Sequence, residues 1–243
     1  MPSFTKASLP INFLVNPEVY HMVNTLEGYV SRSLPEEGAF TTNPNLSKKV
    51  DQIGDFLQFM GNTTVFLLSE GTKQELGKLQ QSLYDRAGQM LAKRLDPSTF
   101  HMTLHDLVNG PEGTPGLESK MEAVADRVKE LISGWRNMMN LKMRTTWLFN
   151  MVNTSIVLGL APADTDTAQR LDRMYETLED VVRLGYAMTP HITMAYFLPG
   201  TYSQDQLASL RAVLKPVELE VELKMEDLVY QVFRDMNHYD TVF

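Results

Sequence analysis

The chain has 243 residues, of which 43% are hydrophobic and 21% charged, with a formal net charge of −8 and no cysteine. The missing cysteine excludes disulfides and thiolate metal sites, and the acidic balance argues against a long nucleic acid as partner, since such binding needs a basic field. With no secretory signal and no apolar run near the ~18 residues that cross a bilayer, a cytoplasmic protein without membrane contact is expected.

Residues 1–61 carry the weakest pattern. Apolar residues at helical spacing predict a short helix in residues 19–30 and a second in residues 46–60, and residues 33–38 are typical of a loop. We interpret residues 1–61 as an N-terminal extension that packs on the main domain.

Residues 62–243 form the main domain, with a duplicated order of strand, helix, strand, helix, strand. In the half from about 62 to 151, the elements are expected at 64–68, 72–91 (opened by the capping-box match Thr72-x-x-Glu75), 98–107, 117–131 and 141–151. In the half from about 154 to 236, they are expected at 155–160, 168–182, 190–198, 203–214 (opened by Ser203-x-x-Gln206) and 219–232.

The segment 98–107 alternates between polar and apolar residues, which is typical of a strand with one buried face. One parity holds Thr99, His101, Thr103 and His105, and the other holds Phe100, Met102 and Leu104. Imidazole, hydroxyl and imidazole in a row are unusual on a solvated strand face. This pattern therefore indicates that the polar face of the strand takes part in a chemical reaction.

The pattern recurs at His191-Ile192-Thr193, 191 − 101 = 90 positions further on. One His-x-Thr is a weak signal, but two copies on matched strands are rarely accidental. If the two strands face one cleft, one imidazole can accept a proton while the other donates one. Threonine hydroxyls can donate hydrogen bonds to anionic oxygens, so the set could cleave a phosphodiester without metal or cofactor.

At His101-Met102-Thr103 and His191-Ile192-Thr193 the sequence resembles the 2H phosphoesterase superfamily, which includes cyclic phosphodiesterases and 2′-5′ RNA ligase-like proteins. The resemblance covers residues 62–236 and is silent about residues 1–61. It implies an α+β, bilobal, pseudo-twofold fold in which two antiparallel sheets line a central cleft and helices lie outside. It also implies that His101, Thr103, His191 and Thr193 are catalytic.

Other interpretations stand beside this one. His101 and His105 are spaced i, i+4, which on a helix could bind a metal, but the alternation indicates a strand and no third ligand is evident, so no metal is expected. His105 could border the cleft or be solvated. Lys142 and Arg144 could hold phosphate or belong to a solvated strand face. Tyr196 has the parity of the core.

The sequence thus favours a metal-independent phosphodiesterase for a small cyclic-phosphate or 2′-5′-linked nucleotide, acting as a monomer on a nucleotide or short oligonucleotide. A non-catalytic nucleotide or RNA-end binding module on the same fold is the alternative. A scaffold with two structural motifs is a third.

Overall fold

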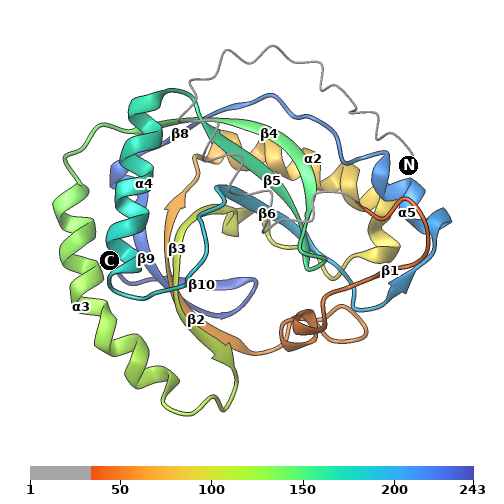
Figure 1. Cartoon of the computed structure of the whole chain (residues 1–243), viewed down its shortest axis with the longest axis horizontal. Coiled ribbons are helices and arrows are strands. Elements are labelled where there is room, and N and C mark those ends of the chain that lie inside the picture. The colour runs from red at the N-terminus through yellow and green to blue at the C-terminus, as the bar shows by residue number, and fades with distance from the viewer. Residues whose placement is uncertain (1–33) are drawn as a thin grey trace, which may run out of the picture.

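The computed structural model describes residues 34–243, so the helix expected in residues 19–30 lies outside the described part. Two four-stranded antiparallel sheets form the framework (Figure 1). The first has the order β10 (His238–Thr241), β9 (Leu228–Asp235), β2 (Phe59–Leu67), β3 (His101–Pro111). The second has the order β6 (His191–Tyr196), β5 (Ser155–Pro162), β4 (Leu141–Met151), β8 (Glu220–Leu223). A short pair joins β1 (Phe40–Thr41) to β7 (Thr201–Tyr202).

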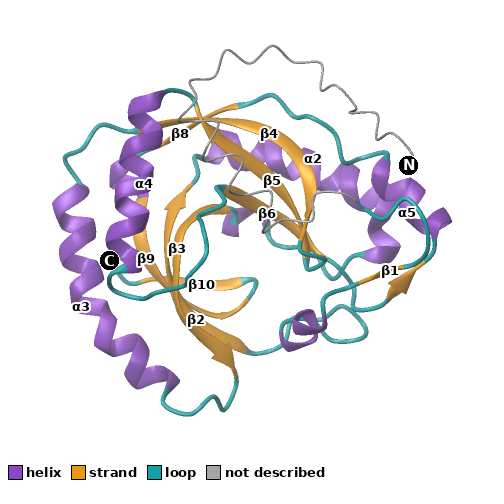
Figure 2. Cartoon of the chain, in the orientation of Figure 1, coloured by secondary structure: helices purple, strands orange, loops and turns teal. Residues whose placement is uncertain are grey.

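The helices lie around these sheets, which confirms the predicted α+β class (Figure 2). Residues 34–243 contain four α-helices: α2 (Glu70–Ala87), α3 (Leu117–Trp135), α4 (Thr165–Glu179) and α5 (Gln204–Arg211). Helix α3 packs on β2, β3 and β9, α4 contacts both sheets through β3, β4 and β5, and α2 contacts α5 and β6. Four 3-10 turns complete the described part: η2 (Pro44–Lys48), η3 (Gly88–Met90), η4 (Pro97–Thr99) and η5 (Met225–Asp227).

The duplicated order of elements is present, but the two halves exchange their last strands. Strand β4 belongs to the half 62–151 yet pairs with β5 of the second half, and β9 of the half 154–236 pairs with β2 of the first. The prediction of a single strand at 219–232 is wrong. This region forms two strands, β8 and β9, which lie in different sheets and are separated in the chain by η5.

The helix expected in residues 46–60 is also wrong, because only the turn η2 forms before β2 begins at Phe59. Its spaced apolar residues do not share a buried face: Val50 is fully buried, whereas Ile53 is 78% exposed. Gly54, at φ +89°, then adopts the left-handed conformation that ends a helix.

The two helix starts that we expected from capping boxes have different outcomes. Ser203 and Gln206 form the capping box of α5 as predicted. Helix α2 instead begins after Ser69, whose hydroxyl accepts the backbone N–H of Thr72, so the N-cap lies three residues earlier than the sequence match indicated.

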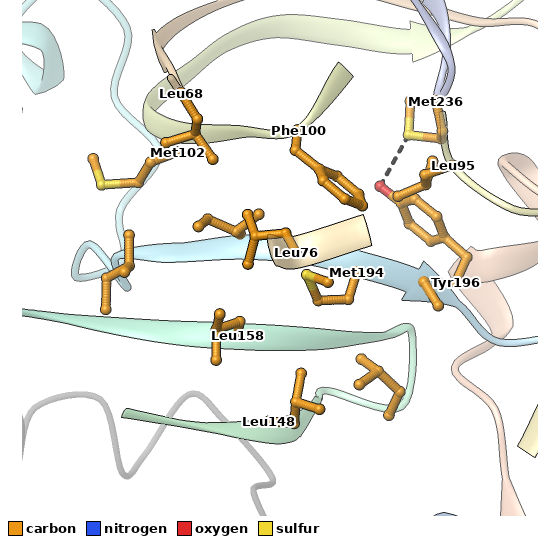
Figure 3. Close-up of a cluster of buried hydrophobic side chains, with 14 of the residues drawn as sticks. Leu68, Leu76, Leu95, Phe100, Met102, Leu148, Leu158, Met194, Tyr196 and Met236 are labelled. Atoms are coloured by element: carbon orange, nitrogen blue, oxygen red, sulfur yellow. Dashed lines mark hydrogen bonds between the residues drawn. The ribbon is translucent and has the colours of Figure 1, made fainter. Parts of the chain in front are cut away.

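The apolar sides of the two His-Thr strands pack on each other in the centre of the molecule (Figure 3). Phe100 and Met102 of the first and Met194 of the second belong to one cluster, in which Leu76 of α2 lies between Phe100 and Met194, and Leu158 of β5 lies on the far side of Met194. All five are at most 2% exposed. Because these apolar side chains are committed to the core, the alternating polar side chains are presented on the opposite face of each strand.

Candidate active site

A cavity of about 350 Å³ opens where β3 and β6 meet. These strands are edge strands of different sheets, and they contact each other. His101 and Thr103 from β3 and His191 and Thr193 from β6 all border this cavity. The structure therefore brings together the four residues that the two motifs singled out.

Both histidines are held by the same local bond. The Nδ1 atom of His101 lies 2.8 Å from the carbonyl oxygen of Thr99, and Nδ1 of His191 lies 2.6 Å from that of Thr189. A carbonyl oxygen can only accept, so Nδ1 carries the proton in each neutral ring. The lone pair of each neutral ring is therefore on Nε2, and within residues 34–243 neither Nε2 atom makes a hydrogen bond.

The electrostatic environment keeps both imidazoles neutral near pH 7. Burial lowers the pKa of His101 to about 4 and also lowers the pKa of His191. The negative charge of Asp106 opposes this by raising the pKa of each. A charge on His191 would lower the pKa of His101, so the two rings are close enough to influence each other.

The two threonines leave their hydroxyls available. Thr103 and Thr193 are partly exposed, and neither hydroxyl hydrogen-bonds to another residue in the described part of the chain. Each can therefore donate to an oxygen of a bound ligand.

A β-bulge after each motif changes which residues face the cavity. The pairing of β2 with β3 skips Leu104, and the pairing of β5 with β6 skips Met194. One extra residue reverses the alternation that follows it. In β3 this turns His105 inward, where it is 1% exposed, and returns Asp106 to the partly exposed face. Asp106 thereby takes the partly exposed position that the uninterrupted alternation assigned to His105, and both residues border the cavity.

His105 is not solvated. Its Nε2 lies 3.1 Å from a carboxylate oxygen of Glu179, and its ring centroid lies 4.9 Å from that of Tyr175, both on α4. Burial lowers the pKa of His105, and the bond to Glu179 acts in the opposite direction. Glu179 also accepts hydrogen bonds from the backbone N–H groups of Leu184 and Gly185, so Glu179 connects His105 of β3 to the loop before His191. His105 also borders the cavity.

The structure does not bring Lys142 and Arg144 to the cavity. Both lie on β4, opposite Glu222 and Glu220 of β8, whereas the cavity lies at the β6 edge of that sheet. Tyr196 is buried, as its parity indicated, but it also borders the cavity, and its hydroxyl donates to the sulfur of Met236 at 3.1 Å (Figure 3).

Among the cavity residues that the sequence did not reveal, Asp106, Tyr239 and Lys49 matter most for the chemistry. Asp106 depends on the bulge, and Tyr239 reaches the site from β10, with its ring centroid 5.0 Å from that of His101. Lys49 comes from the N-terminal segment, residues 34–58, which precedes β2 and carries no sequence motif. The only available signal was the equal spacing of Asp106 and Tyr196, each five residues after its histidine.

Within residues 34–243, no three or more His, Asp and Glu side chains form a cluster that could hold a metal ion. The helices of the same range include none that is long and apolar enough to span a membrane.

Comparison with solved structures finds the same fold elsewhere. The conserved protein of unknown function ATU0111 from Agrobacterium tumefaciens is 22% identical, with a TM-score of 0.62 over 84% of this chain and 93% of that one. TT0787 of Thermus thermophilus is 16% identical (TM-score 0.48, 75% and 95% covered), and E. coli LigT is 9% identical (TM-score 0.49, 76% and 96% covered). At these identities the likeness concerns the fold alone. No protein-family model and no curated protein matches the sequence.

Proposed function

We propose that this chain is a 2H-type phosphoesterase that hydrolyses a small cyclic-phosphate or 2′-5′-linked nucleotide without a metal ion. One observation carries the proposal: two neutral imidazoles and two free hydroxyls, from edge strands of different sheets, border a single cavity. Two titratable groups placed as a pair suit a reaction in which one proton is removed and another is supplied.

In the proposed reaction, the free Nε2 of one histidine takes a proton from water as the water oxygen bonds to phosphorus. The bond from phosphorus to the leaving oxygen breaks, and the other imidazole, protonated, gives that oxygen its proton. The negative charge of the bound phosphate raises the pKa of the imidazole beside it, which favours the protonated form. Thr103 and Thr193 donate hydrogen bonds to the phosphate oxygens as their charge increases.

The dimensions and the charge of the molecule favour a small substrate. A cavity of about 350 Å³ lies in the range of sites for single small molecules. A net charge of −8 opposes the accumulation of a long polyanion on the surface. We therefore expect a mononucleotide or a short oligonucleotide as the substrate.

The test is turnover of a panel of cyclic mononucleotides, cyclic dinucleotides and 2′-5′ oligonucleotides, with EDTA present. Loss of a general acid or base costs about 10²–10⁴-fold in rate, so His101→Ala and His191→Ala should each lower kcat/KM by this factor. The double variant should fall by far less than the product, because the pair acts as a unit. Thr103→Val and Thr193→Val should cost less, since each removes one neutral hydrogen-bond donor.

The matched control is His238→Ala, which removes an exposed histidine that bonds Asp235 outside the cavity lining. It should leave turnover unchanged. Activity that disappears with EDTA and returns with a divalent metal would contradict the mechanism. Tight nucleotide binding without any turnover would instead favour a binding module.

A further inference from the structure

The charges that border the cavity are few. Among the bordering residues in the range 34–243, Lys49 is the only lysine or arginine and Asp106 the only carboxylate. The two motif histidines are neutral near pH 7, and the threonines bring no charge. A phosphodiester is an anion, so the cavity offers it one cationic side chain, and that side chain comes from outside the two motifs.

The N-terminal segment fixes the backbone of Lys49. The turn η2 ends at Lys48, and the N–H of Lys49 donates to the carbonyl of Leu46, while the carbonyl of Lys49 accepts from Leu57. The neighbouring side chains, Leu46 and Val50, are fully buried. These bonds fix the backbone of Lys49, and its side chain reaches the cavity, which Asn45 of the same segment also borders.

The same segment is tied to the second sheet. The N–H of Asn43 donates to the carbonyl of Asn153 at 2.9 Å, in the turn between β4 and β5, and the Asn43 amide donates to the carbonyl of Val152. After Lys49 the chain enters β2 of the first sheet. Lys49 thus lies in the stretch of chain between Asn43, which is bonded to the second sheet, and β2 of the first sheet, and it borders the cavity.

The ammonium group of Lys49 has no ionic partner. Its Nζ lies 4.7 Å from the ring centroid of Phe59 and 5.9 Å from that of Tyr196, and none of the ion pairs within residues 34–243 includes it. Burial lowers its pKa, and the charge of Asp106 acts in the opposite direction. A partly buried cation that contacts aromatic faces but no carboxylate is stabilised when an anion enters.

We infer that Lys49 binds a non-bridging phosphate oxygen of the substrate, so that the N-terminal segment completes the site that the two motifs form. The inference rests on the proposed function for the identity of the substrate, but the anion site can be tested without turnover. Lys49 supplies binding and charge neutralisation, while the histidines move the protons.

The test compares inorganic phosphate binding, by titration calorimetry, in the wild type, Lys49→Met and Lys48→Met. Methionine keeps an apolar stem against Phe59 but removes the charge. A hydrogen bond to a charged group is worth about 10- to 100-fold in affinity, so Lys49→Met should weaken phosphate binding and raise KM by that factor, with a smaller change in kcat. Lys49→Arg should restore part of the affinity. The Lys48→Met variant, which changes an exposed neighbour, is the matched control, and its affinity for phosphate should equal that of the wild type.

A second measurement uses the wild-type protein and so does not depend on how the variants fold. Phosphate should slow acetylation of Lys49 by acetic anhydride, as followed by mass spectrometry, and should leave acetylation of Lys48 unchanged. Equal phosphate affinity in the wild type and Lys49→Met, or no protection of Lys49, overturns the inference whatever the activity. If no phosphodiester is turned over but phosphate binding still depends on Lys49, the proposed function fails and the anion site stands.

Discussion

Asp106 acts against burial on the pKa of both motif histidines. It is the only carboxylate that borders the cavity within residues 34–243, and its charge raises the pKa of both His101 and His191 against the effect of burial. Burial has the larger effect, so the pKa of each imidazole stays below its ordinary value. In the proposed reaction, the base must be unprotonated and the acid protonated, so these pKa values fix the pH range of activity.

We expect the bell-shaped profile of kcat/KM to have both limbs below pH ~6.5, the ordinary pKa of histidine. The rising limb follows deprotonation of the base, and the falling limb follows loss of the proton from the acid. The profile of kcat should fall at higher pH, because bound phosphate raises the pKa of the acid. Parallel pH profiles of kcat and kcat/KM check this, provided that chemistry limits the rate.

Asp106→Asn should move both limbs of the kcat/KM profile to lower pH. It removes a negative charge that, together with the bonds from the rings to the carbonyls of Thr99 and Thr189, raises both pKa values. Asp126→Asn, on the exposed side of α3, is the control and should leave the profile in place. A shift to higher pH in Asp106→Asn, or no shift, would contradict this account of the site.

At the scale of elements, the alternation of residues 98–107 predicted the His-Thr face correctly as far as Thr103. Beyond it the prediction failed, because the bulge at Leu104 reverses the alternation. Leu104 and Met194 are ordinary apolar residues, so nothing in the local sequence marks either bulge. The same limit explains why Asp106 was missed and why His105 was expected on the polar face.

Close packing next to the cavity makes one glycine of β2 indispensable. A Cβ on Gly61 would lie 2.5 Å from Cζ of Phe233 and 2.7 Å from the carbonyl oxygen of Val108, which belongs to the backbone and cannot rotate away. Gly61→Ala should therefore lower the free energy of unfolding by about 1–3 kcal/mol, as overpacking does. Urea denaturation measures this.

Gly134→Ala is the control for that experiment. Gly134 lies within α3, and a Cβ there would meet no heavy atom within 4 Å. Alanine should raise the free energy of unfolding by about 0.5–1 kcal/mol, because it loses less conformational freedom in a helix. If both variants changed stability in the same direction, the packing described around Gly61 would be wrong.

At the scale of the whole molecule, the exchange of β4 and β9 makes each sheet depend on both halves of the chain. The duplicated order of elements could be predicted from the hydrophobic periods, because those periods are local. The exchange could not, since β4 and β9 would satisfy their own pattern equally well in either sheet. The two-strand outcome for residues 219–232 has the same cause.

We expect the described part of the chain to unfold in one step. One contiguous core includes residues from both sheets, and neither sheet is complete without a strand from the other half. In scanning calorimetry the van't Hoff and calorimetric enthalpies should agree. Two resolved transitions, one for each sheet, would show that the exchanged strands do not couple the halves.

The matching bonds from Nδ1 of His101 and His191 to the carbonyls two residues earlier have a further consequence. Two imidazoles in the same tautomer do not by themselves determine the direction of proton transfer, since either ring could accept the first proton. The surroundings are unequal: five residues beyond its histidine, one strand places a carboxylate and the other a phenol, and Lys49 approaches both from the N-terminal segment. In the proposed reaction, the neighbours of the histidines therefore decide which ring accepts the first proton. Exchanging Asp106 and Tyr196 would test this without changing either motif.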